Sequence, residues 1–254
     1  MSAPAASVLV SYLGAGDSLS ADEHALLAGF ESRTLEYARG AKVHDQGEVL
    51  DSLYIVRDGW LRLDNELLDG RRHIVRTFQR GDVIGLHDLA ESRSLTALVA
   101  CTDAVICPFP RRILAELAIA APRIVSLLLA LSARDQAVLS DLLRITGRLS
   151  ARERVAYLLL VYLHRARASD ASLVDTFPLG LDQSQTGDMI GLTNVSVSKA
   201  FVSLESEGLI TRHRQFVTLS DIPRLSRGIG FVNRFTPIDV SWFPTSSAAA
   251  NLSA

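Results

Sequence analysis

The hydrophobic pattern of this chain changes once, close to Pro108 and Pro110. Before that point, from about residue 32, short apolar segments are separated by glycines: Gly40, Gly47, Gly59, Gly70, Gly81 and Gly85. This pattern predicts strands joined by tight turns, with the best candidates at 52–57, 60–63, 73–78 and 98–107. After Pro110 the apolar residues recur at helical spacing. We therefore expect an α+β fold in which a small β-barrel or sandwich precedes a set of helices.

The composition limits how such a chain can act. Its 254 residues favour two modest domains, because a single domain typically has about 100–150. A formal net charge of −2 excludes binding of nucleic acid or membrane by bulk charge, so any DNA contact must come from a local patch. The N-terminus lacks the basic residues of a secretory leader, and no apolar run approaches the roughly 20 residues that span a bilayer. We expect a cytoplasmic protein with no membrane partner.

Several helices have recognisable starts. Ser20 with Glu23, and Ser150 with Glu153, have the spacing of capping boxes. Pro122 is a favoured first-turn residue. Helices are therefore expected at 18–30, at 111–119, from 122, and from 150 to 160–164, with a polar connection at 165–172 and a disordered tail at 245–254.

The helix that begins at Pro122 carries apolar residues at seven-residue spacing, which is typical of a seam that pairs with a partner helix. The seam residues are Ile124, Leu128, Leu131, Val138, Leu142 and Ile145. Asp135 interrupts the seam. We predict parallel pairing of two such helices in a homodimer. The alternative is a helix buried against its own barrel, because amphipathic stripes often face a protein's own core.

The segment from Asp182 to Leu204 has the features of a helix-turn-helix. Asp182 can cap the first helix, and Gly187 is small where two helices must approach closely. Gly191 can adopt the left-handed conformation that ends a helix, and Thr193 can cap the next one. The residues spaced to face inward together are Ile190, Leu192, Val197, Phe201 and Leu204.

The opposite side of the second helix would then be free to enter the major groove of DNA. The candidate base-reading residues are Asn194, Val195, Ser198 and Lys199, and the candidate phosphate contacts are Thr193 and Ser196. Lys199 can donate to guanine, and Val195 can contact a thymine methyl group.

Residues 207–219 follow with two alternating β stretches around a basic tip, the pattern of a winged helix. Arg212 and Arg214 are expected to reach the DNA backbone from this wing. From Ala168 to the end the chain carries six basic and eight acidic residues. DNA binding therefore depends on where the charges lie and not on their sum.

Taken together, these motifs resemble the Crp/Fnr family of bacterial transcription regulators, over roughly residues 20–225. The stretches that carry the resemblance are Asp51–Gly59, Gly81–Gly85, Gly191–Lys199 and Leu204–Ile210. The resemblance implies an eight-stranded β-roll of cyclic-nucleotide-binding type (a double-stranded β-helix, or jelly roll), a long dimerisation helix and a C-terminal winged helix-turn-helix. The expected divisions are 1–120, 121–148 and 149–254. It also implies a homodimer that binds double-stranded DNA, contacts RNA polymerase and responds to a signal sensed by the β-roll.

The expected effector pocket departs from the family pattern. By resemblance it contains Gly85, Leu86, His87, Leu95 and Thr96. Cyclic-AMP-binding members have a Glu where this chain has Leu86, and an Arg-Ser pair where it has Leu95 and Thr96. Without the Glu a ribose hydroxyl would lack its acceptor, so the sequence argues against a cyclic nucleotide and leaves the effector unknown.

Other family sensors are also poorly matched. Oxygen-sensing members carry an N-terminal cysteine cluster for an iron–sulfur centre, and residues 1–100 contain no cysteine, which excludes that sensor. His87 lies close to the haem ligand of a carbon-monoxide-sensing branch, but the neighbouring cysteine is missing, and an ordinary surface or hydrogen-bonded histidine is the alternative. Cys101 and Cys107 match neither a disulfide framework nor a CxxC pair, and we expect buried, inert thiols.

The sequence thus predicts a sequence-specific DNA-binding regulator and no enzyme. Many family members have Glu and Arg in the positions of Val195 and Lys199, so the operator should differ from the commonest family sequence. One alternative is a cyclic-nucleotide-binding module that acts on a protein partner, which leaves the helix-turn-helix unexplained. Another is a cupin-like metal enzyme on the β-roll, which needs converging histidines, and the chain has no HxH pair.

Overall fold

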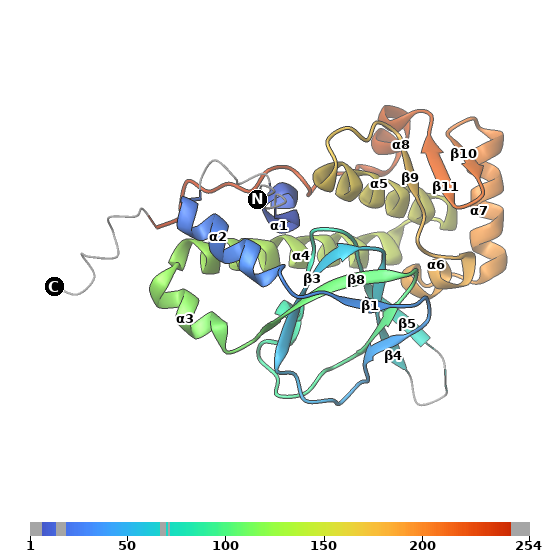
Figure 1. Cartoon of the computed structure of the whole chain (residues 1–254). Helices are drawn as coiled ribbons and strands as arrows, with labels where there is room; N and C mark the ends of the chain where they lie inside the picture. The colour runs from blue at the N-terminus through green and yellow to red at the C-terminus, as the bar shows by residue number, and fades with distance from the viewer. Residues whose placement is uncertain (1–6, 14–18, 67–69, 71, 245–254) are drawn as a thin grey trace.

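Two four-stranded antiparallel sheets form the first half of the molecule (Figure 1). The computed structural model describes residues 7–13, 19–66, 70 and 72–244. The strands are β1 (Leu35–Tyr37), β2 (Lys42–His44), β3 (Ser52–Asp58), β4 (Leu61–Glu66), β5 (Arg72–Phe78), β6 (Val83–Ile84), β7 (Ala97–Ala100), β8 (Ala104–Pro110), β9 (Thr176–Pro178), β10 (Ile210–His213) and β11 (Phe216–Leu219). The first sheet has the order β1-β8-β3-β6 and the second β2-β7-β4-β5. Buried apolar residues of both sheets share one core, so the sheets close into the expected β-roll.

The predicted strand at 98–107 is two strands, β7 and β8, separated by a turn at 101–103. The turn is fixed by Thr102, whose Oγ1 accepts a hydrogen bond from the backbone N of Trp60 at 2.9 Å. Periodicity continues through these residues, so the prediction of one long strand was wrong. The turn depends on a polar contact with a residue more than 40 positions away.

β8 also continues through both prolines that close the strand region. Pro108 pairs with Tyr54 on β3, whereas β1 pairs with β8 only as far as Ile106. Beyond Ile106 one edge of β8 is therefore free of a neighbouring strand. A proline that lacks an N–H is tolerated there, because no ladder partner needs that donor.

The helices begin largely where capping signals place them. They are α1 (Val8–Leu13), α2 (Ala21–Phe30), α3 (Ile113–Ala120), α4 (Pro122–Arg148), α5 (Ala151–Ser169), α6 (Gln183–Ile190), α7 (Asn194–Ser206) and α8 (Ile222–Ile229), with a short 3₁₀ helix η2 (Leu86–Asp88). Both hydrogen bonds of the capping box are present at Ser20 and Glu23, and again at Ser150 and Glu153. These local signals are confirmed.

α1 was not predicted, because six residues are too few to show a helical period. It is held in place by the buried carboxylate of Glu31. This carboxylate accepts hydrogen bonds from Ser7 Oγ at 2.6 Å and from the backbone N of Val8 at 3.0 Å and of Leu9 at 3.1 Å. A charged side chain thus satisfies the free N–H groups at the start of this helix.

α5 is longer than the sequence predicts. It continues to Ser169, through the polar residues that suggested a connection. Arg165 lies in this stretch and is buried, pairing with Asp82 of the β-roll and donating through Nη1 to the backbone O of Thr77 at 2.9 Å. A residue that looks like surface in the sequence is therefore an internal contact between the two halves.

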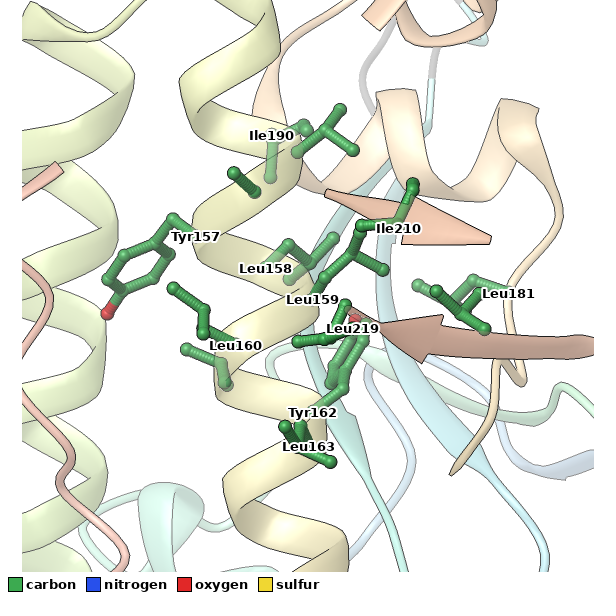
Figure 2. Close-up of a cluster of buried hydrophobic side chains, with 14 of the residues drawn as sticks. Tyr157, Leu158, Leu159, Leu160, Tyr162, Leu163, Leu181, Ile190, Ile210 and Leu219 are labelled. Carbon is green, nitrogen blue, oxygen red and sulfur yellow. The ribbon is translucent and has the colours of Figure 1, made fainter. Parts of the chain in front are cut away.

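A second core surrounds α5 (Figure 2). Every residue from Val155 to Leu163 is buried, so the middle of this helix is covered on all sides. It packs against α6, α7 and α8 and against the small sheet β10-β11-β9. Tyr162 extends the core toward the β-roll, where its ring meets that of Trp60 edge-on with centroids 4.7 Å apart.

Residues 231–244 form an extended segment, here called the C-terminal strap, that leaves α8 and returns to the N-terminal helices (Figure 1). Near its start Phe231 stacks on His164 of α5, with ring centroids 5.4 Å apart. Arg234 Nε then donates to Asp141 of α4 at 2.9 Å. At its end Phe243 is buried in a core that includes residues of α1 and α2. The strap therefore contacts both halves of the molecule.

α3 and α4 meet at a bend of 120°. Across the described ranges, no single helix is both long and apolar enough to cross a membrane, and α3 and α4 satisfy that length and composition only when taken as a bent pair.

Candidate nucleic-acid interface

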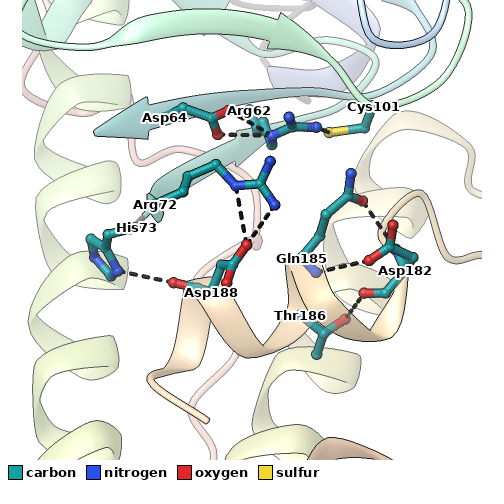
Figure 3. Close-up of polar contacts among 9 residues, drawn as sticks. All are labelled: Arg62, Asp64, Arg72, His73, Cys101, Asp182, Gln185, Thr186 and Asp188. Carbon is teal, nitrogen blue, oxygen red and sulfur yellow. Dashed lines mark hydrogen bonds and ion pairs between the residues drawn. The ribbon is translucent and has the colours of Figure 1, made fainter. Parts of the chain in front are cut away.

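α6 and α7 form the predicted helix-turn-helix. Asp182 Oδ1 accepts from the N of Gln185 at 2.8 Å, and Gln185 Oε1 accepts from the N of Asp182 at 3.0 Å, which starts α6 with a capping box (Figure 3). Gly191 ends the helix in the left-handed conformation, with φ 66°. A Cβ on Gly187 would lie 2.4 Å from the carbonyl O of Leu192, so the turn requires glycine at that position.

The outward side of α7 is open to solvent. Its inward side is buried in the second core through Val197, Ala200, Phe201 and Leu204. The predicted DNA-contacting residues divide into the exposed Thr193, Asn194, Val195 and Lys199 and the half-buried Ser196 and Ser198. The structure therefore brings all six together at the N-terminal end of one helix.

Thr193 caps α7 and also engages Ser196. The backbone N of Ser196 donates to Thr193 Oγ1 at 3.2 Å, and the two hydroxyl oxygens lie 2.9 Å apart. The free N–H groups of the first turn carry the positive end of the helix dipole. This end of α7 is therefore suited to an anionic oxygen such as that of a phosphate.

The wing is the hairpin of β10 and β11, and it places its two arginines differently. Arg214 lies exposed at the tip, with φ 56°. Arg212 is half-buried: its Nε and Nη2 donate to the carboxylate of Glu205 at 2.9 and 2.7 Å, and its guanidinium lies 4.4 Å from the ring centroid of Phe201. Here Arg212 joins the wing to α7, and the predicted backbone contact would require it to leave that pair.

The two carboxylates at the C-terminal end of α7 are paired with arginines. The hydrogen bond from Arg212 lowers the pKa of Glu205, and Arg152 Nε donates to Glu207 Oε1 at 2.7 Å. Counting acidic residues in the sequence could not show this, because Arg152 lies on α5. The surface around α7 is consequently less negative than its composition suggests.

An exposed apolar residue of α7 was missed. Val202 is 57% exposed and lies on the same side as Val195, which is 63% exposed. The signal was available, since residues seven apart in a helix share a face.

The predicted seam of α4 packs inside its own chain. Ile124, Leu128 and Leu131 lie in the core with α1 and α2, Ile145 lies in the core around α5, and Val138 and Leu142 pack on that same core. Asp135, the break in the seam, pairs with Arg76 of β5 at 2.5 Å. The described arrangement is thus the alternative in which the stripe faces the protein's own barrel. The prediction failed because a seven-residue period does not say which partner covers it.

The β-roll and the helix-turn-helix touch directly (Figure 3). Arg72 of β5 donates to Asp188 Oδ2 of α6 through Nε at 3.1 Å and Nη2 at 2.6 Å, and His73 Nδ1 lies 2.9 Å from the backbone O of Asp188. These contacts join β5 to the first helix of the motif.

Both cysteines are free and buried. Burial raises the pKa of Cys101 to about 11, although Arg62 lies beside it with Nη1 3.7 Å from Sγ. Burial also raises the pKa of Cys107. Neither has the accessible thiolate of a reactive cysteine.

Two family models match this chain one after the other. The Cyclic nucleotide-binding domain matches residues 34–120, and the Crp-like helix-turn-helix domain matches residues 153–227. The chain belongs to the Crp/Fnr family. As a member of it, the protein is a DNA-binding transcriptional regulator.

This Crp/Fnr regulator is similar along most of its length to characterised members. It is 29% identical over 193 residues to the nitrogen fixation regulation protein FixK of Bradyrhizobium diazoefficiens, covering 76% of this chain and 80% of the relative. It is 28% identical over 200 residues to the transcriptional activator protein FnrL of Cereibacter sphaeroides, covering 76% and 79%. The solved structure of FixK2 from Bradyrhizobium japonicum matches with a TM-score of 0.69 and 26% identity, over 77% of this chain and 96% of that one.

The pocket residues expected in a Crp/Fnr regulator lie around η2 and the start of β7. Gly85 precedes η2, and Leu86 is buried. His87 is held by its neighbour, with Nε2 3.2 Å from Asp88 Oδ2. Leu95 is exposed, whereas Thr96 is buried and its Oγ1 has no hydrogen-bond partner. Of the five residues, only His87 and Thr96 have polar side chains.

These residues do not fit a cyclic nucleotide, the ligand that the matched domain implies. Asp88 is buried beside them, and its Oδ1 has no hydrogen-bond partner. Burial alone would raise the pKa of Asp88, but the hydrogen bond and charge of His87 lower it below its usual value. A cyclic phosphate bound here would therefore be repelled by the Asp88 carboxylate. Arg93, the nearby cation, is exposed and donates to the backbone O of Gly47 at 2.9 Å.

A cupin-like metal enzyme would need ligating side chains gathered at one point of the β-roll. Within the described ranges, no group of three or more His, Cys, Asp or Glu is placed to hold a metal ion.

Proposed function

We propose that this regulator acts as a homodimer in which the two copies of α7 enter successive major grooves of a two-fold-related operator. Asn194, Val195, Ser198 and Lys199 would contact base edges, and Thr193, Ser196 and Arg214 would contact phosphates. The observation that carries the proposal is the exposure of the N-terminal end of α7, with its opposite side anchored in the core.

The two lysines of the chain provide a matched test of this surface. Lys199 lies on the exposed side of α7, whereas Lys42, the other lysine, lies on the β-roll and pairs with Asp45. Lys199→Ala should weaken gel-shift binding to the regulator's own upstream DNA roughly 5- to 100-fold, and Lys42→Ala should leave it unchanged. Equal affinities for the two variants would contradict the proposed interface.

The dimer contact is proposed on a different side of α4 from the predicted seam. Leu129 and Leu143 are 61% and 77% exposed. They belong to a stripe whose members are spaced by alternate steps of three and four: Ser126, Leu129, Ala133, Gln136, Ser140, Leu143 and Gly147. This is the spacing of a coiled-coil seam, and the small Ala133 and Ser140 between the leucines would let two helices approach closely. The occupant we propose is α4 of a second copy.

Substitutions at two leucines distinguish this contact from the seam predicted from the sequence. Leu143→Asp should give folded monomers in sedimentation, since the residue faces solvent within its own chain and only the contact with the second copy is lost. Leu131→Asp, at a buried position, should instead lower the melting temperature. A Leu143→Asp variant that sediments as an intact dimer would rule out the exposed stripe.

In this proposal residues 1–120 sense a signal, residues 121–148 hold the dimer and residues 149–254 bind DNA. The contact of Arg72 with Asp188 supports a route from β5 to α6. Contact with RNA polymerase is included because FnrL is named a transcriptional activator. The regulator would act in the cytoplasm, where its operator lies. Mass spectrometry of small molecules retained by the purified protein, together with its visible absorption spectrum, would test for an effector.

A further inference from the structure

The exposed side of α7 carries two valines in one line. Val195 and Val202 are 63% and 57% exposed, whereas Val197, on the other side of the same helix, is fully buried. Seven residues correspond to almost two full turns, so the two side chains point the same way and lie about 10.5 Å apart along the axis. Ser198 and Lys199 lie between them.

The same surface has no carboxylate to accept a hydrogen bond from the amino group of cytosine. The two carboxylates at the end of α7, Glu205 and Glu207, are held by Arg212 and Arg152. What α7 (Asn194–Ser206) offers to a base edge is therefore the Asn194 amide, hydroxyls, one ammonium group and the methyl groups of the two valines. Among the four base pairs, only those with thymine present a methyl group in the major groove.

We infer that Val195 and Val202 together select the C5-methyl groups of two thymines in each operator half-site. The inference rests on the proposed function, because it requires α7 to lie in the major groove. Successive base pairs are about 3.4 Å apart along the duplex axis and further apart along the winding groove, so a helix that follows the groove would place the two contacts about two to three base pairs from each other. Val202 is thereby a specificity-determining residue in addition to the N-terminal residues of the helix.

The test removes single methyl groups from the DNA. The full-length protein first selects its preferred duplex from a randomised pool, and each thymine of that duplex is then replaced by deoxyuridine. Loss of one contacted methyl should weaken binding about fourfold, since burying one such group contributes about 0.8 kcal/mol. We expect this loss at two thymines in each half-site, about two to three base pairs apart, and at no other thymine.

Protein variants then assign each methyl to its valine. Val195→Ala should abolish the effect of deoxyuridine at one of the two positions, and Val202→Ala at the other. Val174→Ala is the matched control, because Val174 is 72% exposed but lies just before β9, outside α7. It should leave affinity and deoxyuridine sensitivity unchanged.

The outcomes separate this inference from the proposed function. If no duplex is enriched, the proposed function fails. If a duplex is enriched but deoxyuridine is tolerated at every thymine, the proposed function stands and the methyl selection is overturned. If the sensitivity persists in both valine variants, the assignment to these residues is wrong, and if only Val195→Ala alters it, the role of Val202 is overturned.

Discussion

Removing one partner of the buried ion pair between Asp82 and Arg165 should destabilise the protein far more than removing both. The two side chains are only 4% and 5% exposed. Arg165 also donates to the backbone O of Thr77 at 2.9 Å, and Asp82 accepts from the backbone N of Gln79 at 2.7 Å. Asp82→Asn keeps the shape of the side chain but leaves the guanidinium buried without a counter-ion, which costs about 3–5 kcal/mol. In a chain of this length the melting temperature should fall by roughly 6–20 °C.

The double variant Asp82→Asn/Arg165→Met removes both charges and should recover more than half of that loss. Scanning calorimetry of the parent, the two single variants and the double variant would measure the coupling. Asp45→Asn is the control, since Asp45 pairs with Lys42 on the surface and its loss should not shift the melting temperature measurably. The reasoning is refuted if Asp82→Asn melts with the parent, or if the double variant is no more stable than the weaker single one.

Three further predictions concern the strap, the histidines and the thiols. Phe243→Ala should lower the free energy of unfolding in urea by about 3–5 kcal/mol, because the ring is buried. Trp242→Ala should change that free energy little, because its ring is 52% exposed. Equal decreases in the two variants would contradict the packing of the strap. Burial lowers the pKa of His44 and of His164 in the folded state, so the unfolded chain takes up protons first as the pH falls below about 6.5. The free energy of unfolding should therefore decline from that pH down to the folded-state pKa values, by at most about 1.4 kcal/mol per pH unit for each histidine. Urea unfolding at pH 7.5, 6.5 and 5.5 would measure this decline, and the double variant His44→Gln/His164→Gln should show a flatter profile. Cys101 and Cys107 should react with a thiol reagent only on the timescale of unfolding; rapid labelling of the native protein would show that they are accessible.

The elements that the sequence predicts well are those whose evidence is local. The capping boxes at Ser20 and Ser150 specify helix starts from residues three apart, and both form as expected. The helix-turn-helix is similarly predictable, because Asp182, Gly191 and Thr193 each determine the backbone at their own position. Such signals do not depend on what the rest of the chain packs against.

The features that the sequence did not predict depend on contacts between distant residues. Arg165 reads as surface and is buried because Asp82 lies opposite it. Arg212 reads as a DNA contact and is paired with Glu205. On α4 two sides carry leucines, and only the folded chain shows that Leu131 faces inward and Leu143 outward. Periodicity identifies an amphipathic helix but not the surface that covers it.

The C-terminal strap has a practical consequence for dissecting this protein. Truncating the chain after α8 would remove three contacts of the strap at once. These are the stack of Phe231 on His164, the hydrogen bond from Arg234 to Asp141, and the packing of Phe243 on the N-terminal helices. The truncated protein would expose apolar surface on both halves of the molecule and would be prone to aggregate. Swapping the DNA-reading portion into another regulator should therefore carry residues 231–244 and their docking sites along with it.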